Sequence, residues 1–348
     1  MIPKVLIASM GGTITMAPDK KGILRPVING QQLFELIPSL KRFKNMLRIE
    51  YYEIENLDST NLNPSHWTKL AMFLAENRNR YDGFIVTHGT DTMAYSASAM
   101  AFSLGKNFDR PIIFTGSQTP LRVLGTDAPF NVENSLIALA QAIKEDIVEI
   151  MITFGYSVLR AVRTIKISES EFCAFGSPRF PELAHISASG INFDNNSFRK
   201  TGEKFTPKFQ FRRGILILEL VPGQEPGIII EAINSGKCCG LIMRSHGSGN
   251  VPIIGEYSLI PVIQEAVKKD IPVLISTKFV GGQTKDIYEP ARIAIRAGAI
   301  PTGDMTDIAS QVKFMWALDQ GVRKRQLLHD FIHKDFVGEI TEEKKKLN

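Results

Sequence analysis

The chain has 348 residues, of which 44% are hydrophobic, and a net charge of +5. This composition is ordinary for a globular protein, and the length suggests two domains. The basic residues are scattered, so a nucleic-acid-binding stripe is not expected. No apolar run approaches the roughly 20 residues that span a bilayer, and the N-terminus lacks a signal-peptide pattern. Three cysteines without C-x-x-C spacing predict neither a disulfide framework nor a zinc site, so we expect a cytoplasmic protein.

The first part of the chain alternates strand and helix patterns. Short apolar runs predict strands over residues 5–8, 48–55, 83–86, 111–115 and 147–154. Helical spacing between them predicts helices over residues 65–81, 93–104 and 131–144. Pro64 and Ser65 should open the first of these helices, because Ser is a good N-cap. Such alternation predicts parallel strands joined by helical crossovers.

A change in composition separates this part from the rest of the chain. Residues 191–212 have little apolar periodicity, which is typical of an interdomain linker. Alternation then resumes, with strands expected over 215–221, 241–243 and 271–276 and helices over 228–234, 259–269, 288–296 and 310–319. We therefore expect an α/β fold with two domains of mostly parallel sheet. The larger domain would cover residues 1–190 and the smaller one 213–348.

Hydroxyl groups directly follow two of the predicted strands. The strand 83–86 runs into Thr87-His88-Gly89-Thr90-Asp91-Thr92, and the strand 5–8 runs into Met10-Gly11-Gly12-Thr13-Ile14. Open parallel sheets bind ligands at the carboxyl ends of their strands. A Thr hydroxyl becomes a good nucleophile only when a neighbouring group removes its proton. The two turns therefore suggest a nucleophile together with its activating partners.

An ordered set of motifs resembles the bacterial-type L-asparaginases. In chain order the motifs are Gly11-Gly12-Thr13-Ile14, Asp58-Ser59, His88-Gly89-Thr90-Asp91-Thr92, Thr115-Gly116-Ser117-Gln118, Arg163-Thr164-Ile165-Lys166, Arg244-Ser245-His246-Gly247-Ser248-Gly249-Asn250 and Gly303-Asp304-Met305-Thr306. They extend over nearly the whole chain, and the missing signal peptide resembles the cytoplasmic, type I branch. The resemblance implies hydrolysis of L-asparagine to L-aspartate and ammonia through a threonine acyl-enzyme.

The resemblance assigns catalytic roles to four residues. Thr13 would be the nucleophile, and Lys166 would accept its proton through Thr90, in a Thr-Lys variant of the catalytic triad. Asp91 would orient Lys166 and also hold the substrate ammonium. Backbone amides around Gly12 would stabilise the oxyanion. The residues alone leave other interpretations open, with Thr13 as a turn cap, Asp91 as a helix cap and Lys166 as an exposed charge.

Further polar residues are expected to bind the substrate. Asp58, Ser59 and Thr60 could bind the α-ammonium and α-carboxylate groups, and the resemblance assigns the first two to this role. An Asx turn is the alternative interpretation of this segment. Ser117, which follows the fourth predicted strand, is expected to line the same pocket. Family members form dimers of intimate pairs, in which an Asn matching Asn250 reaches the neighbouring site, so we expect a homodimer or homotetramer.

Two positions depart from the family's pattern. Met10 stands where the family usually has Thr, and Ile23 stands where it usually has a catalytic Tyr. In relatives this Tyr lies on a mobile loop that closes over the site and hydrogen-bonds the nucleophile. We therefore expect either that another hydroxyl, such as that of Thr15, replaces the Tyr, or that the enzyme is slow.

The histidines do not predict a metal site or a Ser-His-Asp triad. None shows a spacing such as H-E-x-x-H, and His88 is expected to point away from Thr90 or to fill a core position. No phosphate-binding G-x-x-x-x-G-K-[ST] sequence is present. We therefore expect no cofactor, no metal, and neither a nucleic-acid nor a membrane partner. The expected substrate is L-asparagine, with L-glutamine as a weak one, because Asp58 and Ser59 follow the cytoplasmic branch.

Two other functions stay open at this point. The first is an amidotransferase subunit that supplies ammonia to a tRNA-bound substrate together with a partner subunit. That relative usually carries an extra N-terminal domain, which these 348 residues lack. The second is a catalytically impaired amino-acid-binding protein, an interpretation that Met10 and Ile23 motivate.

Overall fold

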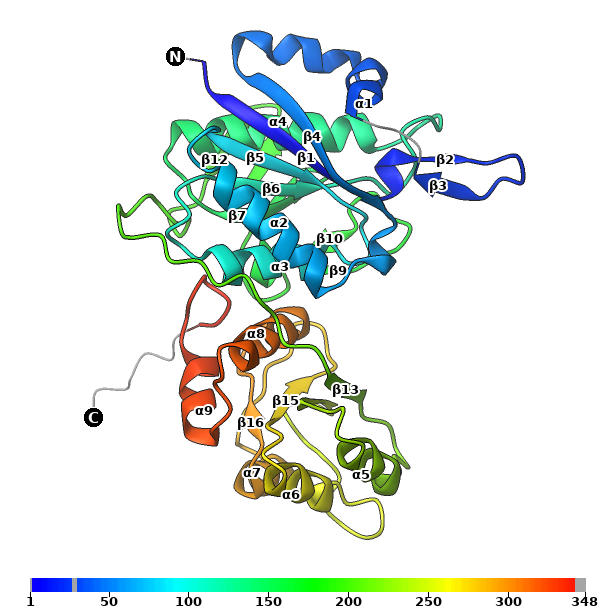
Figure 1. Ribbon diagram of the computed structural model, residues 1–348, viewed down its shortest axis with the longest axis vertical. Helices are drawn as coiled ribbons and strands as arrows, with labels where there is room; N and C mark the ends of the chain where they lie inside the picture. Colours follow the sequence, from blue (N-terminus) through cyan, green and yellow to red (C-terminus); the bar gives the residue numbers. More distant parts are fainter. Residues whose placement is uncertain (1, 27–29, 342–348) are drawn as a thin grey trace. The chain divides into compact units, whose positions relative to one another are not determined.

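The computed structural model describes residues 2–26 and 30–341. The chain divides into two compact units, Met1–Phe209 and Gln210–Asn348. Figure 1 shows helices and strands in both units, so each is an α/β structure. In the described part of the chain, no helix has the length and apolar character needed to cross a membrane.

The N-terminal unit is built on one large, mixed sheet. Its strands, in spatial order, are β12 (Gly190–Phe193), β11 (Ala184–Ser187), β8 (Ser157–Arg160), β7 (Ile150–Phe154), β6 (Ile112–Thr115), β5 (Gly83–Thr87), β1 (Lys4–Gly11) and β4 (Arg48–Leu57). The pairs from β7 to β4 are parallel. The pairs of β8 with β7, β8 with β11 and β11 with β12 are antiparallel. The predicted α/β fold with mostly parallel strands is confirmed.

The antiparallel end of this sheet begins at a tight turn. Phe154 of β7 pairs with Ser157 of β8, so only Gly155 and Tyr156 connect the two strands. Gly155 has a φ of 61°, which suits a two-residue hairpin connection. The strands β8, β11 and β12 have only four residues each, and no sequence pattern predicted them.

Helices cover both faces of the large sheet. The helix α4 (Ala128–Lys144) packs against β5, β6 and β7, and α3 (Met93–Leu104) packs against β6 and β7 and beside α2 (Pro64–Asn77). Figure 1 shows α4 behind the sheet and α2 and α3 in front of it. The N-cap of α2 is Asn63 rather than Ser65, because the Asn63 side chain accepts the backbone N–H of Ser65 at 3.0 Å.

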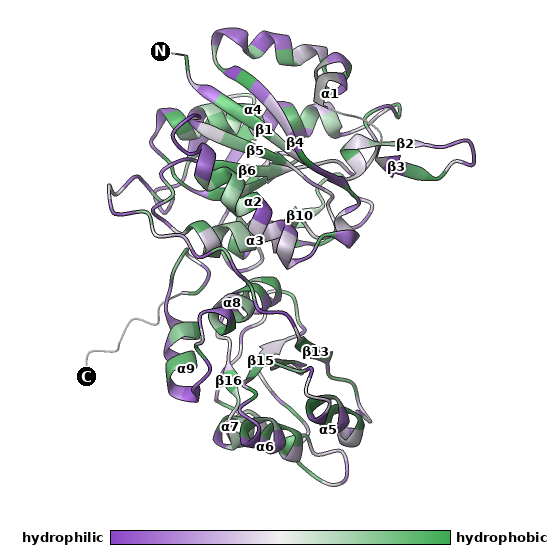
Figure 2. Ribbon diagram, in the orientation of Figure 1, coloured by the Kyte–Doolittle hydropathy of each residue, from purple (hydrophilic) through white to green (hydrophobic). Residues whose placement is uncertain are grey.

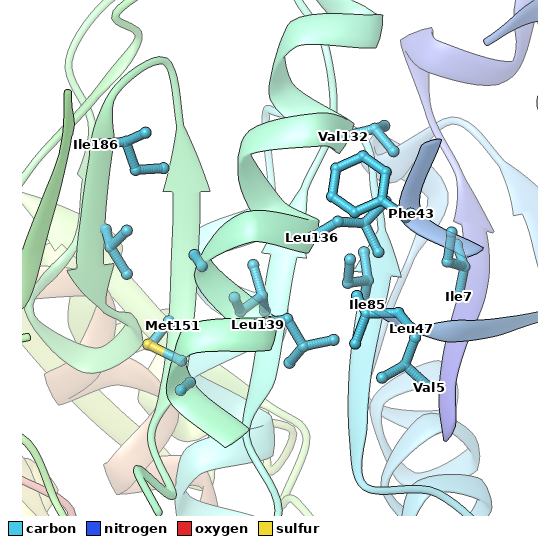
Figure 3. Close-up of a cluster of buried hydrophobic side chains, with 14 of the residues drawn as sticks. Val5, Ile7, Phe43, Leu47, Ile85, Val132, Leu136, Leu139, Met151 and Ile186 are labelled. Atoms are coloured by element: carbon cyan, nitrogen blue, oxygen red, sulfur yellow. The ribbon is translucent and has the colours of Figure 1, made fainter. Parts of the chain in front are cut away.

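One core of the N-terminal unit lies between the sheet and α4. Figure 3 shows Leu136 and Leu139 of this helix beside Ile85 of β5, within a fully buried cluster. Figure 2 shows the central strands β5 and β6 in the hydrophobic colour. A sheet buried on both faces has near-continuous apolar strands, and all five residues of β5 are buried accordingly.

Short elements complete the N-terminal unit. They are the hairpin of β2 (Met16–Pro18) and β3 (Leu24–Pro26), the helix α1 (Gly30–Leu36), the pair β9 (Ile165–Lys166) and β10 (Phe175–Gly176), and the 3-10 turns η1 (Thr13–Thr15), η2 (Pro38–Asn45), η3 (Ser59–Asn61) and η4 (Ala161–Arg163). The expected linker 191–212 begins inside β12, and residues 200–214 form neither helix nor strand. Part of this stretch lies along the unit, since the Lys208 N–H donates to Ser103 O at 2.9 Å.

The C-terminal unit has a smaller, wholly parallel sheet. Its order is β13 (Ile215–Glu219), β14 (Gly240–Ser245), β15 (Val273–Thr277) and β16 (Ile300–Pro301). Its helices are α5 (Pro226–Asn234), α6 (Ile260–Lys268), α7 (Glu289–Ala297), α8 (Asp307–Asp319) and α9 (Arg325–His333). Alternate strand residues face opposite helix layers: Met243 belongs to the core formed with α5 to α7, and Ile242 to the core formed with α8 and α9.

Candidate active site

Three turns of the N-terminal unit meet through glycines. Gly12, after β1, has a φ of 90°, and a Cβ atom on it would lie only 2.2 Å from the backbone N of Gly89. A Cβ atom on Gly89, after β5, would lie 2.6 Å from Ser59 Oγ. Side chains at either glycine would therefore separate the turns. This contact places the turn of Thr13, the turn of Thr90 and the turn of Ser59 side by side.

Thr13 begins the 3-10 turn η1 directly after this contact and is half-buried. The next hydroxyl in the turn has a different environment. Thr15 is buried, and its Oγ1 lies 2.9 Å from Gly12 O and 3.0 Å from Asn56 Oδ1. The Thr15 hydroxyl thus holds the turn together, which leaves it poorly placed to replace the Tyr usual in the family.

Lys166 joins the two residues that follow Gly89. Its Nζ donates to Thr90 Oγ1 at 2.9 Å and to Asp91 Oδ1 at 2.6 Å. The Lys166 side chain is 17% exposed and that of Asp91 58% exposed. Lys166 is therefore not a free surface charge. It is held in place by β9, which pairs with β10. The N-cap of the following helix α3 is Thr92, whose hydroxyl donates to Ser59 O at 2.8 Å.

The Asp58 segment forms the Asx turn that the sequence allowed. Asp58 Oδ1 accepts the Thr60 N–H and the Thr60 hydroxyl, both at 2.9 Å. These bonds cap η3 and fix the direction of the carboxylate. Ser59 is 2% exposed and Thr60 is exposed. An Asx turn and a binding role are compatible. The turn uses Oδ1 of the Asp58 carboxylate, and each carboxylate oxygen has two lone pairs.

Ser117 lies in the turn after β6 but is fully buried. Its hydroxyl donates to Thr119 O at 2.7 Å, so it stabilises its own loop. The carboxylate of Asp127 supports the same loop by accepting the backbone N–H of Gln118 at 2.9 Å and the Asn131 amide at 2.9 Å. Neither Asp127 nor Asn131 was predicted to support the site. The sequence feature that could have indicated their role is a pair of polar residues one helical turn apart, at the start of a mostly apolar helix.

Asn250 belongs to the C-terminal unit, where it follows β14. Its backbone forms a bridge with His246, with N–H···O distances of 2.9 Å and 3.1 Å. In the described part of the chain, Asn250 Oδ1 is buried without a hydrogen-bond partner. Buried amide oxygens are normally hydrogen-bonded, so this one is available to a donor from elsewhere.

Ile23, the position of the usual Tyr, lies in the β2–β3 hairpin. Asp19 shapes the turn: its Oδ1 accepts the backbone N–H groups of Lys21 at 2.8 Å and Ile23 at 3.0 Å. These bonds keep the pKa of the Asp19 carboxyl below its usual value. Ile23 is 52% exposed. Figure 1 shows the hairpin projecting away from the sheet.

His88 was expected either to point away from Thr90 or to fill a core position. It is fully buried, and burial lowers its pKa to about 4. Its Nδ1 lies 2.7 Å from Gly89 O. Within residues 2–26 and 30–341, no group of three or more His, Cys, Asp or Glu side chains is arranged to hold a metal ion. The arrangement instead offers hydroxyl, amine and carboxylate groups at one sheet edge, which suits nucleophilic attack and proton transfer.

Comparison with known proteins identifies the family. The family model "Asparaginase, N-terminal" matches residues 4–199, and the model "Glutaminase/Asparaginase C-terminal domain" matches residues 214–331. L-asparaginase from Thermococcus kodakarensis is 29% identical, over 97% of this chain and 99% of that protein. L-asparaginase 1 from Escherichia coli K12 is 30% identical, over 97% of this chain and 98% of that protein.

A solved structure and a second kind of relative complete the comparison. The thermostable L-asparaginase from Thermococcus kodakarensis superposes with a TM-score of 0.88 at 28% identity, over 97% of this chain and 99% of that chain. A glutamyl-tRNA(Gln) amidotransferase subunit from Aeropyrum pernix is 29% identical, over 97% of this chain but 80% of that protein. Both family models together span most of the chain, and the chain belongs to the asparaginase family.

Proposed function

We propose that the protein hydrolyses the side-chain amide of L-asparagine to give L-aspartate and ammonia. The observation that carries the proposal is the bonding of Lys166 to Thr90 and Asp91, beside the glycine contact that brings in Thr13. The similarity to L-asparaginases over nearly their full length supports the same activity. The enzyme would be a hydrolase acting on linear amides.

The proposed reaction has two steps. The Thr13 Oγ attacks the amide carbon, its proton passes through Thr90 to the Lys166 amine, and the carbonyl oxygen becomes an oxyanion near the backbone of Gly12. Return of the proton to the amide nitrogen releases ammonia and leaves an ester on Thr13. Water then attacks this ester, which frees aspartate and restores the Thr13 hydroxyl. Asp91 would hold both Lys166 and the substrate ammonium.

The proposed substrate contacts follow from the same turns. Asp58 and Ser59 would bind the α-groups, with Thr60 holding the Asp58 carboxylate in position. The buried hydroxyl of Ser117 supports a role in shaping the pocket wall more than one in direct contact. The unpartnered oxygen of Asn250 would complete a site in a second copy of the chain, so we propose a homodimer or homotetramer. A cytoplasmic location is part of the same proposal.

Ammonia supply to a tRNA-bound substrate is a second candidate function, because an amidotransferase subunit is among the relatives. The match extends over 99% of the Thermococcus L-asparaginase but only 80% of the Aeropyrum amidotransferase protein. An amidotransferase of this kind would need a partner subunit. Purification of the tagged chain from its own cells, followed by analysis of associated proteins, distinguishes the two functions: a stoichiometric second subunit would favour the amidotransferase.

An ammonia-release assay tests the main proposal. The purified protein is incubated with L-asparagine or L-glutamine, and ammonia is measured by an enzyme-coupled reaction. We expect release from asparagine, weaker release from glutamine, and none from either with the Thr13→Val variant. Binding of asparagine without ammonia release by the wild type would instead identify an impaired binding protein. Light scattering of the same sample gives the oligomeric state.

A further inference from the structure

A chain of buried hydrogen bonds leads from two helices to the Gly89 turn. Trp67 Nε1 of α2 donates to Ser96 Oγ of α3 at 3.0 Å. Ser96 Oγ lies 2.8 Å from His88 Nε2, and His88 Nδ1 lies 2.7 Å from Gly89 O. Three side chains, from α2, from α3 and from the turn after β5, therefore lead to a single carbonyl group. That carbonyl belongs to the peptide group that also contains the Thr90 N–H.

The direction of this chain is fixed at both ends. An indole N–H of Trp67 can only donate, and the carbonyl oxygen of Gly89 can only accept. Because Gly89 O can only accept, the His88 proton that faces it must lie on Nδ1. Burial lowers the pKa of His88 to about 4, so the ring is neutral at pH 7. Its Nε2 then accepts the Ser96 hydroxyl, and Ser96 in turn accepts from Trp67.

The carbonyl that His88 holds lies where the three turns meet. Gly89 is the residue that contacts Gly12, and it also abuts Ser59. Rotation of the Gly89 carbonyl would move the Gly89–Thr90 peptide. It would also move the Thr90 hydroxyl, which accepts a hydrogen bond from Lys166 Nζ. Hydrogen bonding at this oxygen also polarises the peptide group.

We propose that His88, set in its Nδ1–H form by Trp67 and Ser96, is a positioning residue that orients the Gly89–Thr90 peptide for catalysis. The inference rests on the proposed asparaginase activity. His88 touches no reacting atom in this scheme and acts only through Thr90. Misplacement of a catalytic group by about 1 Å can cost about 100-fold in rate, which is the effect to look for.

Two substitutions separate this role from simple packing. In His88→Asn the amide nitrogen can occupy the place of Nδ1 and donate to Gly89 O. In His88→Gln the amide lies one bond further out, near the place of Nε2, so the donor to Gly89 O is lost while more volume is kept. If His88 positions the peptide, the Asn variant should be the more active of the two. If His88 only fills space, the Gln variant should be the more active.

The test measures kcat and KM for asparagine together with the free energy of unfolding. We expect His88→Gln to lose about 100-fold in kcat and His88→Asn less than about tenfold, each with KM changed less than about threefold. We expect the opposite order in stability, because Asn leaves a cavity and an unpaired Ser96. The same two substitutions at the exposed His185, to Asn and to Gln, serve as controls.

The outcomes are distinct. If kcat follows stability, with the Gln variant the more active, His88 only fills space and the inference fails. If the wild type releases no ammonia, the proposed function fails instead. If neither variant folds, nitrogen chemical shifts of 15N-histidine in the wild type decide the matter. A neutral Nδ1–H form of His88 supports the inference, and an Nε2–H form overturns it.

Discussion

The two units of this protein use the carboxyl ends of their parallel strands differently. In the N-terminal unit, the polar groups after β5 and in β9 bond to one another: Lys166 to Thr90 and Asp91. In the C-terminal unit, the hydroxyls at the ends of β14 and β15 bond to backbone carbonyls. Ser245 donates to Ser276 O at 2.6 Å and Thr277 to Gly247 O at 2.7 Å.

Topology alone therefore does not make a catalytic site. Both edges have the position at which parallel sheets bind ligands. The N-terminal edge combines close backbone approach through Gly12 and Gly89 with a Lys166 amine that bonds to Thr90 and Asp91. At the C-terminal edge, the Ser245 and Thr277 hydroxyls bond to the backbone of the neighbouring strand and of a loop. Chemistry on a common fold therefore depends on particular side chains placed at its edges.

The largest expected effect tests the nucleophile. Thr13→Val should fold normally but lose at least about 1,000-fold in kcat, because removal of a nucleophile removes the covalent route. Ser276→Ala, at the other sheet edge, removes a hydroxyl that donates to Asp307 Oδ1 at 2.9 Å and should leave kcat within about threefold. Ammonia release measures both. Retention of more than about a tenth of the rate by the Thr13 variant would transfer the role to Thr90.

The next effect concerns the two lysines at the sheet edges. Lys166→Met should lower kcat about 1,000-fold with a smaller change in KM, whereas Asp91→Asn should damage both. Lys278→Met is the matched control, because Lys278 Nζ donates to Leu220 O at 3.2 Å and serves its own loop. Steady-state kinetics distinguish these variants. An intact kcat in Lys166→Met would exclude Lys166 as the proton acceptor.

A buried ion pair of the C-terminal unit should affect stability rather than rate. Lys313 Nζ lies 2.6 Å from Glu339 Oε1, and both side chains are fully buried. Glu339→Gln leaves the ammonium without its counter-charge and should cost about 3 kcal/mol of unfolding free energy. Denaturant titration measures this loss. A fall in kcat of more than about tenfold in the folded variant would contradict the separation of roles between the sheets.

His88 should make stability depend on pH. Because its pKa is about 4 when folded and near 6.5 when unfolded, the unfolded chain binds more protons between these values. The contribution is therefore complete above pH 6.5 and is lost as the pH falls towards 4, by about 3 kcal/mol. Burial raises the pKa of Glu149, Asp307 and Glu339, which acts in the opposite direction.

Comparison of the wild type with His88→Asn isolates this contribution. Unfolding free energies from denaturant titrations at pH 7 and pH 4.5 give a difference for each protein. The wild type should lose more stability than the variant on acidification, since the carboxyl groups are common to both. Identical losses would show that His88 titrates normally.

The smallest expected effect concerns the hairpin. Ile23→Tyr supplies the hydroxyl usual in relatives and should raise kcat by about 30-fold, the value of one hydrogen bond to a charged group in the transition state. Ile23→Phe is the control, because it adds the ring without the hydroxyl. An equal gain from both variants would assign the effect to apolar contact.

The sequence predicted the strands and helices with strong periodicity and missed the short ones. The expected strand 215–221 is β13, Ile215–Glu219, and the expected helix 310–319 is α8, Asp307–Asp319. The strands β11 and β12 have four residues each, too few for an alternation to stand out. The true N-cap of α2 was missed because Asn63 and Ser65 are both good capping residues.

The candidate site was predictable mainly through the family resemblance. Lys166 lies 76 residues from Thr90 in the chain, and no local pattern predicts that their side chains meet. The place of Ser117 directly after a strand does not predict which way its side chain faces. Its hydroxyl donates to Thr119 O inside its own loop. The network of His88 depends on Trp67 and Ser96 from separate helices, which only a three-dimensional structure brings together.

The hairpin that carries Ile23 has a consequence for evolution. Met16 pairs with Pro26, so the chain leaves the site region and returns to it at adjacent points. The residues between them are held by their own turn, with Asp19 bonding to Arg25 at 3.1 Å. Insertions and replacements in such a loop disturb the sheet little. Selection can therefore change this hairpin while the sheet edge beside it stays unchanged.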